Sequence, residues 1–408
     1  MTRRKKVLLA AFLVILLSQL PFVYRRYKLG KLGSAVRALN DQQRPSSISD
    51  HLQEIKGVAH VHSFIGGHST GTFQAIIDAA VANDLDFVLM TEHPAANFDT
   101  ASMTLKGDHA GIMFVNGNEV STSTGDRLLL LPGDQQANRA DRLTTQEVLS
   151  GRTAGSAFVA YPHDFRSWDA IGITGIEIYN VYTNAQKINP FVLFFDGLWS
   201  YRSYPDLLFA SFYERPALAL KKWDDEIARS GKQLVAIAGN DSHANVGISL
   251  NDSAGNSLLG LQLDPYERSF RLVRLHVLVS ALIPYSRDNP LDADAVLTAI
   301  ARGRCFIGFD LFGDTTGFRF WAVNSAAEMA IMGDSINLQG GVRLKVEMPI
   351  PGRVLVFKNG VEIHSQAGTQ LEFPANEKGV YRIEVYLPQL PHPVREQPWI
   401  ISNPIYVR

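Results

Sequence analysis

The sequence has almost no cysteine, since Cys305 is the only one among 408 residues. A chain with one cysteine cannot form an internal disulfide, and it cannot build a metal site from several thiolates. The surrounding Arg304-Cys305-Phe306-Ile307 is typical of the start of a buried strand, so we expect Cys305 to fill space in the core. Any metal site in this chain would therefore use histidine and carboxylate ligands.

An excess of one charge is also missing, because 39 Lys and Arg stand against 40 Asp and Glu and the formal net charge is -1. No overall field marks the chain as a nucleic-acid binder, and it has no polybasic stripe with interleaved aromatic residues. The hydrophobic fraction of 46% and the charged fraction of 19% indicate a globular chain with a large core. These features favour a small ligand over a long nucleic acid.

The sequence contains one long run that is both uncharged and mostly apolar, from Val7 to Tyr24, and basic residues flank it on both sides. A helix of that length spans roughly 27 Å, close to the thickness of a hydrocarbon core. Its end, Gln19-Leu20-Pro21-Phe22-Val23-Tyr24, offers no small residues for signal peptidase, which favours an uncleaved single-pass membrane anchor over residues 1–28. A removed signal peptide is the alternative. The basic N-terminus weakly favours a body outside the cytoplasm.

The hydrophobic pattern divides the rest of the chain into three regions. Residues 29–54 are expected to form a tether. Residues 55–312 alternate short unbroken apolar runs with helical spacing, which predicts a parallel sheet covered on both faces, and the number of units predicts an α/β barrel. Within this region, residues 190–216 are rich in Phe, Leu, Tyr and Trp and are expected to form helical packing or a lid. Residues 313–408 alternate apolar and polar positions around an Asn359-Gly360 turn, which predicts a small antiparallel β-sandwich.

Histidine and carboxylate residues follow the ends of the predicted strands. They are His60, His62, His68, Glu92, His93, Glu119, His163, Asp241 and His243. The carboxyl ends of the strands carry the active site of an α/β barrel, so we expect these side chains to meet on one face. Residues i and i+2 of a strand point the same way, so both members of His60-Val61-His62 could reach one cation. A set of unrelated core and surface histidines is the alternative.

These motifs together resemble those of the polymerase and histidinol phosphatase family, the PHP phosphoesterases. The resemblance covers residues 55–310 and rests on His60-Val61-His62 as H-x-H, Thr91-Glu92-His93 near T-D-H, Gly117-Asn118-Glu119, Pro162-His163 and Asp241-Ser242-His243. It implies a distorted (β/α)7 TIM-like barrel that holds two or three divalent ions of zinc, manganese or iron. Glu177 and Asn180 also resemble a family segment and are candidates for orienting the ligands.

The resemblance further implies a ligand set. The first metal would be held by His60, His62, Glu119 and Asp241. Glu119 would bridge to a second metal that His163 completes, and His68, His93 and His243 would hold a third. Family members often carry another histidine shortly after the glutamate, whereas this chain has Asp126 there. Either Asp126 substitutes as an oxygen ligand or only two ions bind, and Glu92 is expected to hold His93 or a bound water rather than a metal.

Chemistry follows from such a centre, because two close cations can share a hydroxide at neutral pH that attacks phosphorus in line. We therefore expect metal-dependent hydrolysis of a phosphate ester at the membrane, with Glu119, Asp241 and His243 as the catalytic residues. A small phosphoester is favoured as the substrate over long nucleic acid. The alternative is a metal-binding envelope module with weak or no activity, which would contact a protein partner through its β-sandwich.

Overall fold

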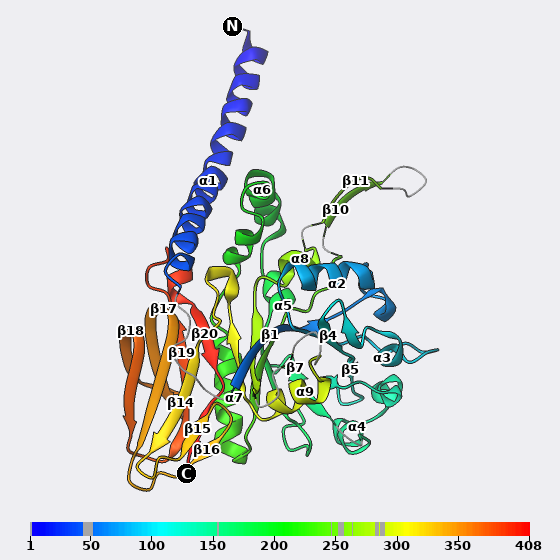
Figure 1. The fold of residues 1–408 in the computed structure, drawn as a ribbon. Helices are drawn as coiled ribbons and strands as arrows, with labels where there is room; N and C mark the ends of the chain where they lie inside the picture. The colour runs from blue at the N-terminus through cyan, green and yellow to red at the C-terminus, as the bar shows by residue number, and fades with distance from the viewer. Residues whose placement is uncertain are drawn as a thin grey trace.

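The computed structural model describes residues 2–43, 52–152, 155–245, 247–251, 257–262, 264–281, 285 and 290–408. The chain begins with one long helix, α1 (Arg3–Asn40), which stands out from the body and carries the N-terminus at its far end (Figure 1). The first half of α1 is exposed, and the helix is long and apolar enough to cross a membrane. It continues to Asn40, into the segment where the sequence predicts a tether, and the end of that segment lies outside the described residues.

The α/β region begins with a mostly parallel group of strands. Strands β1 (Leu52–Val61), β2 (Phe87–Met90) and β4 (Ile112–Val115) run parallel, and helix α2 (Phe73–Ala82) connects the first two. Antiparallel strands flank this group: β3 (Gly107–His109) pairs with β4, while β12 (Arg274–Ser280) lies between β1 and β13 (Cys305–Gly308). All of β2 is buried, as expected for a strand covered on both faces, and Cys305 is buried as predicted.

A second sheet contains five strands in sequence order. They are β5 (Asn118–Ser121), β6 (Arg127–Leu131), β7 (Ser156–Ala160), β8 (Gly175–Asn180) and β9 (Val235–Gly239). The first three are antiparallel, and the last three are parallel. Helices α4 (Thr145–Ser150) and α7 (Ala217–Ser230) lie in the connections before β7 and β9.

The mixed α/β class is therefore confirmed, but the predicted closed barrel is not. Between the described strands, the two sheets meet through isolated bridges, Val61 with Ser242 and Glu92 with Asn118, and not through continuous ladders. The ladder stays open because β12 takes the free edge of β1 along most of its length. The bridges nevertheless bring the carboxyl ends of β1, β2 and β9 and the start of β5 close together.

The C-terminal strands are mainly antiparallel, as predicted, and backbone hydrogen bonds join them to the first sheet. They are β14 (Arg319–Asn324), β15 (Met329–Ile331), β16 (Ser335–Ile336), β17 (Val342–Lys358), β18 (Val361–Ala375), β19 (Gly379–Tyr386), β20 (Pro398–Ser402) and β21 (Ile405–Val407). Strand β20 pairs with β13, which makes one sheet of 14 strands. The predicted turn is confirmed, because Asn359 and Gly360 have φ values of 50° and 80° and join β17 to β18.

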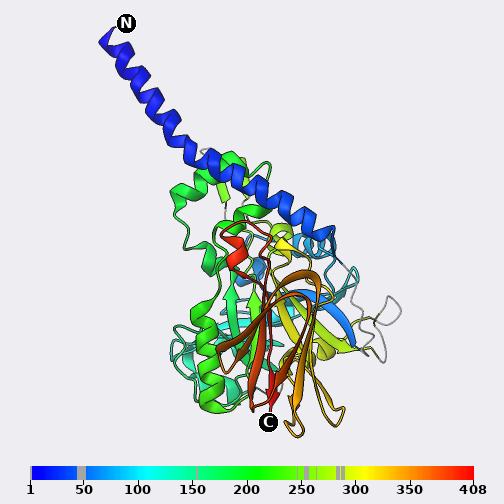
Figure 2. The same ribbon diagram turned by 90° about the vertical axis from the view of Figure 1, so that its left-hand side faces the viewer.

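Residues 190–216 form helical packing, as predicted for this aromatic segment. Helix α6 (Pro190–Ser200) and the 3₁₀ helix η3 (Asp206–Ser211) lie beside the body-proximal half of α1, and both views show this arrangement (Figures 1 and 2). The remaining short elements are η1 (Phe64–Gly66), α3 (Thr100–Met103), η2 (Gln135–Arg142), α5 (Val181–Ala185), β10 (Gly247–Asn251), β11 (Ser257–Gln262), α8 (Tyr266–Ser269), α9 (Ala293–Ala301), η4 (Asp310–Phe312) and η5 (Val394–Glu396).

One hydrophobic core joins these parts. It runs without interruption from Leu32 and Leu39 of α1, through Phe158 and Trp223 of the α/β region, to Ile400 of β20. The end of α1 is thus anchored by burial of its apolar side chains in the body. The C-terminal strands share this core, so they brace the α/β region directly.

Candidate metal centre

Four polar side chains are buried together where the two sheets meet. His60 lies in β1, His62 directly follows β1, Glu119 belongs to β5 and Asp241 follows β9. Each is almost fully inaccessible to solvent, and one ligand atom from each lies within 4.8 Å of the others. Imidazole and carboxylate donors that converge in this way suit a transition-metal cation.

The two imidazoles face the two carboxylates across the centre. His60 Nε2 lies 3.2 Å from Glu119 Oε2 and 3.4 Å from Asp241 Oδ1. His62 Nε2 lies 3.5 Å and 3.4 Å from the same two oxygens. All four atoms therefore point at one shared space, which is the geometry that a common cation needs.

Several of these buried atoms have no hydrogen-bond partner among the residues that the structure describes. They are both ring nitrogens of His62 and Asp241 Oδ1. Leaving a buried polar atom unsatisfied costs about 1–3 kcal/mol. A divalent cation would satisfy His62 Nε2 and Asp241 Oδ1 at once, so the residues fit a metal.

The backbone at these residues is unusual and explains how the two pairs meet. His60 and Asp241 have φ values of 63° and 49°, in the left-handed region, and the pairing of β1 with β2 shifts register at His60. The simple alternation of strand side chains was therefore the wrong reason to expect His60 and His62 together, because a bulge brings them there. Ser242 N donates to His60 O and His62 N donates to Ser242 O, which ties the two strand ends to each other.

Three neighbouring side chains orient the centre. His60 Nδ1 donates to Glu177 Oε1 at 2.6 Å, which turns Nε2 towards the centre, where it lies within hydrogen-bond distance of Glu119 Oε2. Asn180 donates to both Glu177 Oε2 and Asp241 Oδ2 at 3.1 Å, and the Tyr161 hydroxyl donates to Asp241 Oδ2 at 3.2 Å. The second oxygen of Asp241 is thus fixed by donors while Oδ1 faces the centre.

Burial and mutual charge set the protonation of this cluster. Burial, reinforced by the charge of His60, lowers the pKa of His62 to about 3, so this ring is neutral at physiological pH. Burial would raise the pKa of Glu119, but the neighbouring His60 outweighs it and lowers the pKa to about 2. The pKa of Asp241 is likewise lowered. Two ionised carboxylates and a neutral imidazole form a donor set that is ready for a cation at neutral pH.

A second group of three imidazoles extends the first. His62, His93 and His243 offer ligand atoms within 4.8 Å of one another. The ring of His62 stacks against each of the other two, at centroid distances of 4.6 Å to His93 and 4.3 Å to His243. His93 Nε2 also lies 3.5 Å from Glu119 Oε2, so Glu119 faces both groups. This arrangement would suit an adjacent second cation.

Other residues of the predicted site lie around or outside these two groups. His68 is exposed, and its ring meets His93 edge-on at 4.8 Å. His163 is also exposed and lines a cavity with Lys187 and Arg215, which Tyr161, Glu177 and Asn180 also border. Neither histidine belongs to the two described groups.

The two acidic residues that were predicted as possible participants have other partners. Glu92 accepts hydrogen bonds from the amide and hydroxyl of Ser63 and from Thr104, so it fixes the loop after His62 and is not bonded to His93. Asp126 accepts from Thr124, Thr145 and Ser167 and from the amide of Arg166. Both carboxylates therefore stabilise loops that border the centre.

Arg127 is a functional candidate that sequence reasoning missed. Its Nη1 lies 3.2 Å from Glu119 Oε1, its guanidinium lies over the ring of Tyr161, and its side chain is half exposed. Ser121 pairs with Arg127 in the β5–β6 hairpin, which places Arg127 diagonally opposite Glu119 on the same face. Recognition of that hairpin in the sequence would have indicated the contact.

These features define a mixed α/β protein with a buried histidine and carboxylate cluster that fits divalent metal ions. Among solved structures, the chain is similar to a two-domain protein from Bacteroides vulgatus, described as containing a predicted PHP-like metal-dependent phosphoesterase. The TM-score is 0.39 at 12% identity, over 89% of this chain and 98% of that one. It is also similar to PsfC from Pseudomonas syringae, with a TM-score of 0.33 at 12% identity, over 61% of this chain and 90% of that one. No family model matches the sequence, and no curated protein matches it. We therefore derive the chemistry of the site from its own side chains.

Proposed function

We propose that this chain is a metal-dependent phosphoesterase that hydrolyses a phosphate ester with water. The observation that supports this most is the set of buried, unpaired atoms on His62 and Asp241, which face ligand atoms of His60 and Glu119. Zinc, manganese or iron(II) suits these donors. His60, His62, Glu119 and Asp241 would hold one ion, and Glu119 would share a second with His93 and His243.

Bound divalent ions would lower the pKa of a coordinated water and neutralise charge on the phosphate. The protein side chains would orient the ligands and bind the phosphate. Glu177 and Asn180 keep the ligand atoms oriented, and Arg127 is placed to donate to a phosphate oxygen beside Glu119. In the reaction, the water oxygen bonds to phosphorus, the phosphorus–oxygen bond to the alcohol breaks, and the water proton leaves with the alcohol.

The predicted third ion and the barrel-like arrangement belong to this proposal too. A third ion would draw on His68, whose ring already contacts His93. The open strand ends then act as the mouth of a distorted barrel, held by the two isolated bridges. Asp126 stays a supporting residue in this scheme, since donors surround its carboxylate.

We also propose that α1 anchors the enzyme in a membrane, with the body outside the cytoplasm. The support is the length and apolar composition of α1, its exposed first half, and the basic residues at its tip. From Phe22 onward the same helix packs on the body, so the anchor and the enzyme are continuous.

Elemental analysis of the full chain, joined to phosphatase assays with added Mn²⁺ or Zn²⁺, tests the function. We expect bound metal and turnover of a simple ester such as p-nitrophenyl phosphate. His62→Ala should lose both, while His392→Ala, an exposed histidine in an ion pair with Glu396, should keep both. A fully metallated protein that hydrolyses no phosphate ester would refute the proposal and favour the metal-binding envelope module.

A further inference from the structure

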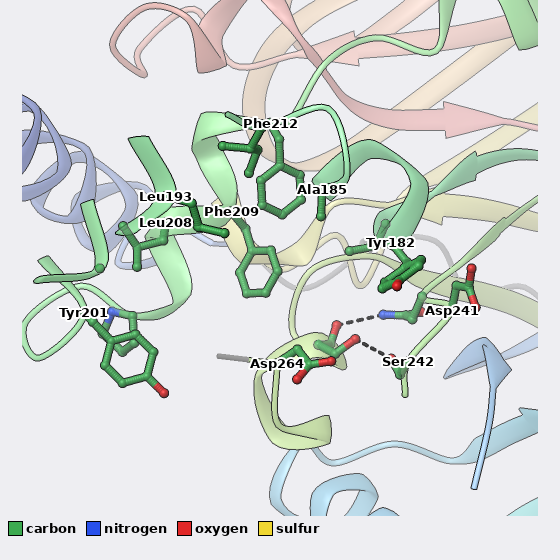
Figure 3. A pocket seen from close by; sticks show the side chains of 16 residues that line it. Tyr182, Ala185, Leu193, Tyr201, Leu208, Phe209, Phe212, Asp241, Ser242 and Asp264 are labelled. Atoms are coloured by element: carbon green, nitrogen blue, oxygen red, sulfur yellow. Dashed lines mark hydrogen bonds between the residues drawn. The ribbon is translucent and has the colours of Figure 1, made fainter. Parts of the chain in front are cut away.

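An apolar cavity extends from the metal centre towards α1. Its volume is about 90 Å³, and its walls come from α5, α6 and η3 together with the loop after β9. Figure 3 shows Leu193, Leu208, Phe209 and Phe212 gathered at one end and Asp241 at the other. A narrow apolar space that ends at a metal ligand suits a substrate with a polar head and an apolar tail.

Helix α6 separates this cavity from the outside. Leu193 and Gly197 line the cavity. Phe191, Phe194 and Leu198 have exposed fractions of 63%, 51% and 68%, and their spacing of three and four residues places them on one stripe. A short helix that exposes three large apolar side chains in a row needs a cover, because such a patch is unfavourable in water.

The contacts of α6 with α1 indicate that this cover is a lipid bilayer. Phe22 of α1 stacks on Phe195 at 4.9 Å, and the Trp199 indole donates to Gln19 at 3.1 Å. Both contacts lie at the end of the apolar run of α1, where a spanning helix would leave the hydrocarbon. The exposed stripe of α6 is therefore continuous with the exposed apolar surface of α1.

Charge supports the same placement. Asp196 is the one charged residue within α6, and Arg25 of α1 pairs with it through both carboxylate oxygens, at 2.6 Å for the closest contact. The helix thus presents no unpaired charge to its surroundings. Tryptophan is enriched at the membrane–water interface, and Trp199 of α6 agrees with a place of this helix there.

We propose that the substrate is a lipid phosphate ester taken from the bilayer, whose tail occupies this cavity while its phosphate reaches the His60, His62 and Asp241 centre. This rests on the phosphoesterase function proposed above. Hydrolysis would release inorganic phosphate and return the lipid alcohol to the bilayer.

The first test measures kcat/KM of the full chain in detergent for dissolved alkyl phosphates of increasing length. Each added methylene that enters the cavity should raise kcat/KM by about fourfold, until the tail outgrows the available space. Equal rates for ethyl and octyl phosphate would overturn the lipid proposal and leave the phosphoesterase function standing. Absence of turnover on every ester would overturn both.

A variant of the cavity wall tests whether the dependence on tail length arises in this cavity. A side chain at Gly197 would meet open space, since no atom lies within 4 Å of the position that a Cβ would take there, so Gly197→Leu can be accommodated and would shorten the cavity. We expect the ratio of octyl to ethyl phosphate turnover to fall by about tenfold or more. An unchanged ratio in a folded variant would show that the tail binds elsewhere and would refute this site.

A third experiment tests whether the substrate enters from the bilayer. It uses the full chain in phosphatidylcholine nanodiscs that carry phosphatidic acid as the probe. Phe194→Gln should lower turnover of the embedded lipid severalfold and leave dissolved octyl phosphate unaffected. The matched control is Val361→Gln, which changes an exposed apolar residue on β18, away from α6 in the sequence. Equal loss in both variants, or loss on the dissolved ester as well, would contradict entry from the bilayer.

Discussion

The described part of the chain holds two clusters of buried histidine and carboxylate side chains, which differ in whether their polar atoms are paired. Around His276, Nδ1 bonds Glu54 at 2.8 Å and Nε2 lies 3.2 Å from Asp310, while Arg319 and Arg274 complete the pairing of the two acids. In the metal centre, His62 and Asp241 keep unpaired atoms. The comparison shows that residue types alone do not define a metal site. The candidate metal centre is distinguished by ligand atoms without a hydrogen-bond partner among the described residues, whereas Arg274 and Arg319 neutralise the acids around His276.

The largest effect should separate the two clusters by function. Asp241→Asn weakens the donor set, so we expect kcat/KM to fall by about a thousandfold or more, with loss of bound metal. The stability of the metal-free fold should fall by less than in the cluster around His276, because Asp241 Oδ1 has no hydrogen-bond partner among the described residues. Phosphatase kinetics measure the loss of kcat/KM, and urea unfolding of the apoprotein measures the change in stability. A large loss of apoprotein stability would show that Asp241 serves the fold instead.

An Asp→Asn change in the cluster around His276 should instead lower the stability of the fold and leave metal binding unchanged. Asp310→Asn leaves His276 and Arg274 without their shared acid, so unfolding free energy should drop by about 3–4 kcal/mol. Metal content should remain that of the wild type. Chemical denaturation together with elemental analysis checks this. If Asp310→Asn released metal and barely changed the stability, the assignment of the two clusters would be reversed.

Stability should also depend on pH through the paired cluster. Burial would lower the pKa of His276, but Asp310 and Glu54 outweigh it and raise the pKa to about 9. A raised pKa stabilises the fold fully below the unfolded value of about 6.5, and that contribution of roughly 3 kcal/mol is lost as the pH rises through 9. Urea unfolding of metal-loaded protein at several pH values should show this decline. His276→Gln should lack that part of the slope, because the other titrating groups are common to both proteins.

The smallest effect concerns substrate binding at the open side of the metal centre. Arg127→Gln removes a half-exposed guanidinium, so we expect KM for a phosphate ester to rise by about tenfold with little change in metal content. Arg166→Gln, which changes an exposed arginine whose described bond is made by its backbone, is the matched control. Equal KM increases in both variants would indicate a general field effect and not a phosphate contact.

Much of the candidate site could be predicted from the sequence, because ligand chemistry is local. His60, His62, Glu119 and Asp241 are of the right types and follow apolar strands, and they do meet. The Asn359-Gly360 turn and the long apolar N-terminal helix were predictable for the same reason, since composition over a few residues determines them.

The features that could not be predicted depend on distant pairings. Strand β12 joins β1 from more than two hundred positions away, and β20 joins β13, so the sheet extends into the C-terminal strands and the barrel stays open. No periodicity within a short segment encodes such partners. The same limit applies to His276, which the sequence presents as an ordinary residue until Glu54 and Asp310 are folded against it.

The unbroken course of α1 has a mechanical consequence. The helix runs from its basic tip to Asn40, whose side-chain oxygen accepts a hydrogen bond from the Asp314 amide, and its last turns bury Leu32 and Leu39 in the body. With the first half of α1 embedded in lipid, this continuous helix would hold the proposed catalytic site at a fixed height and tilt above the bilayer. Turnover would then follow the density of ester in the plane of the membrane and not its concentration in the surrounding water.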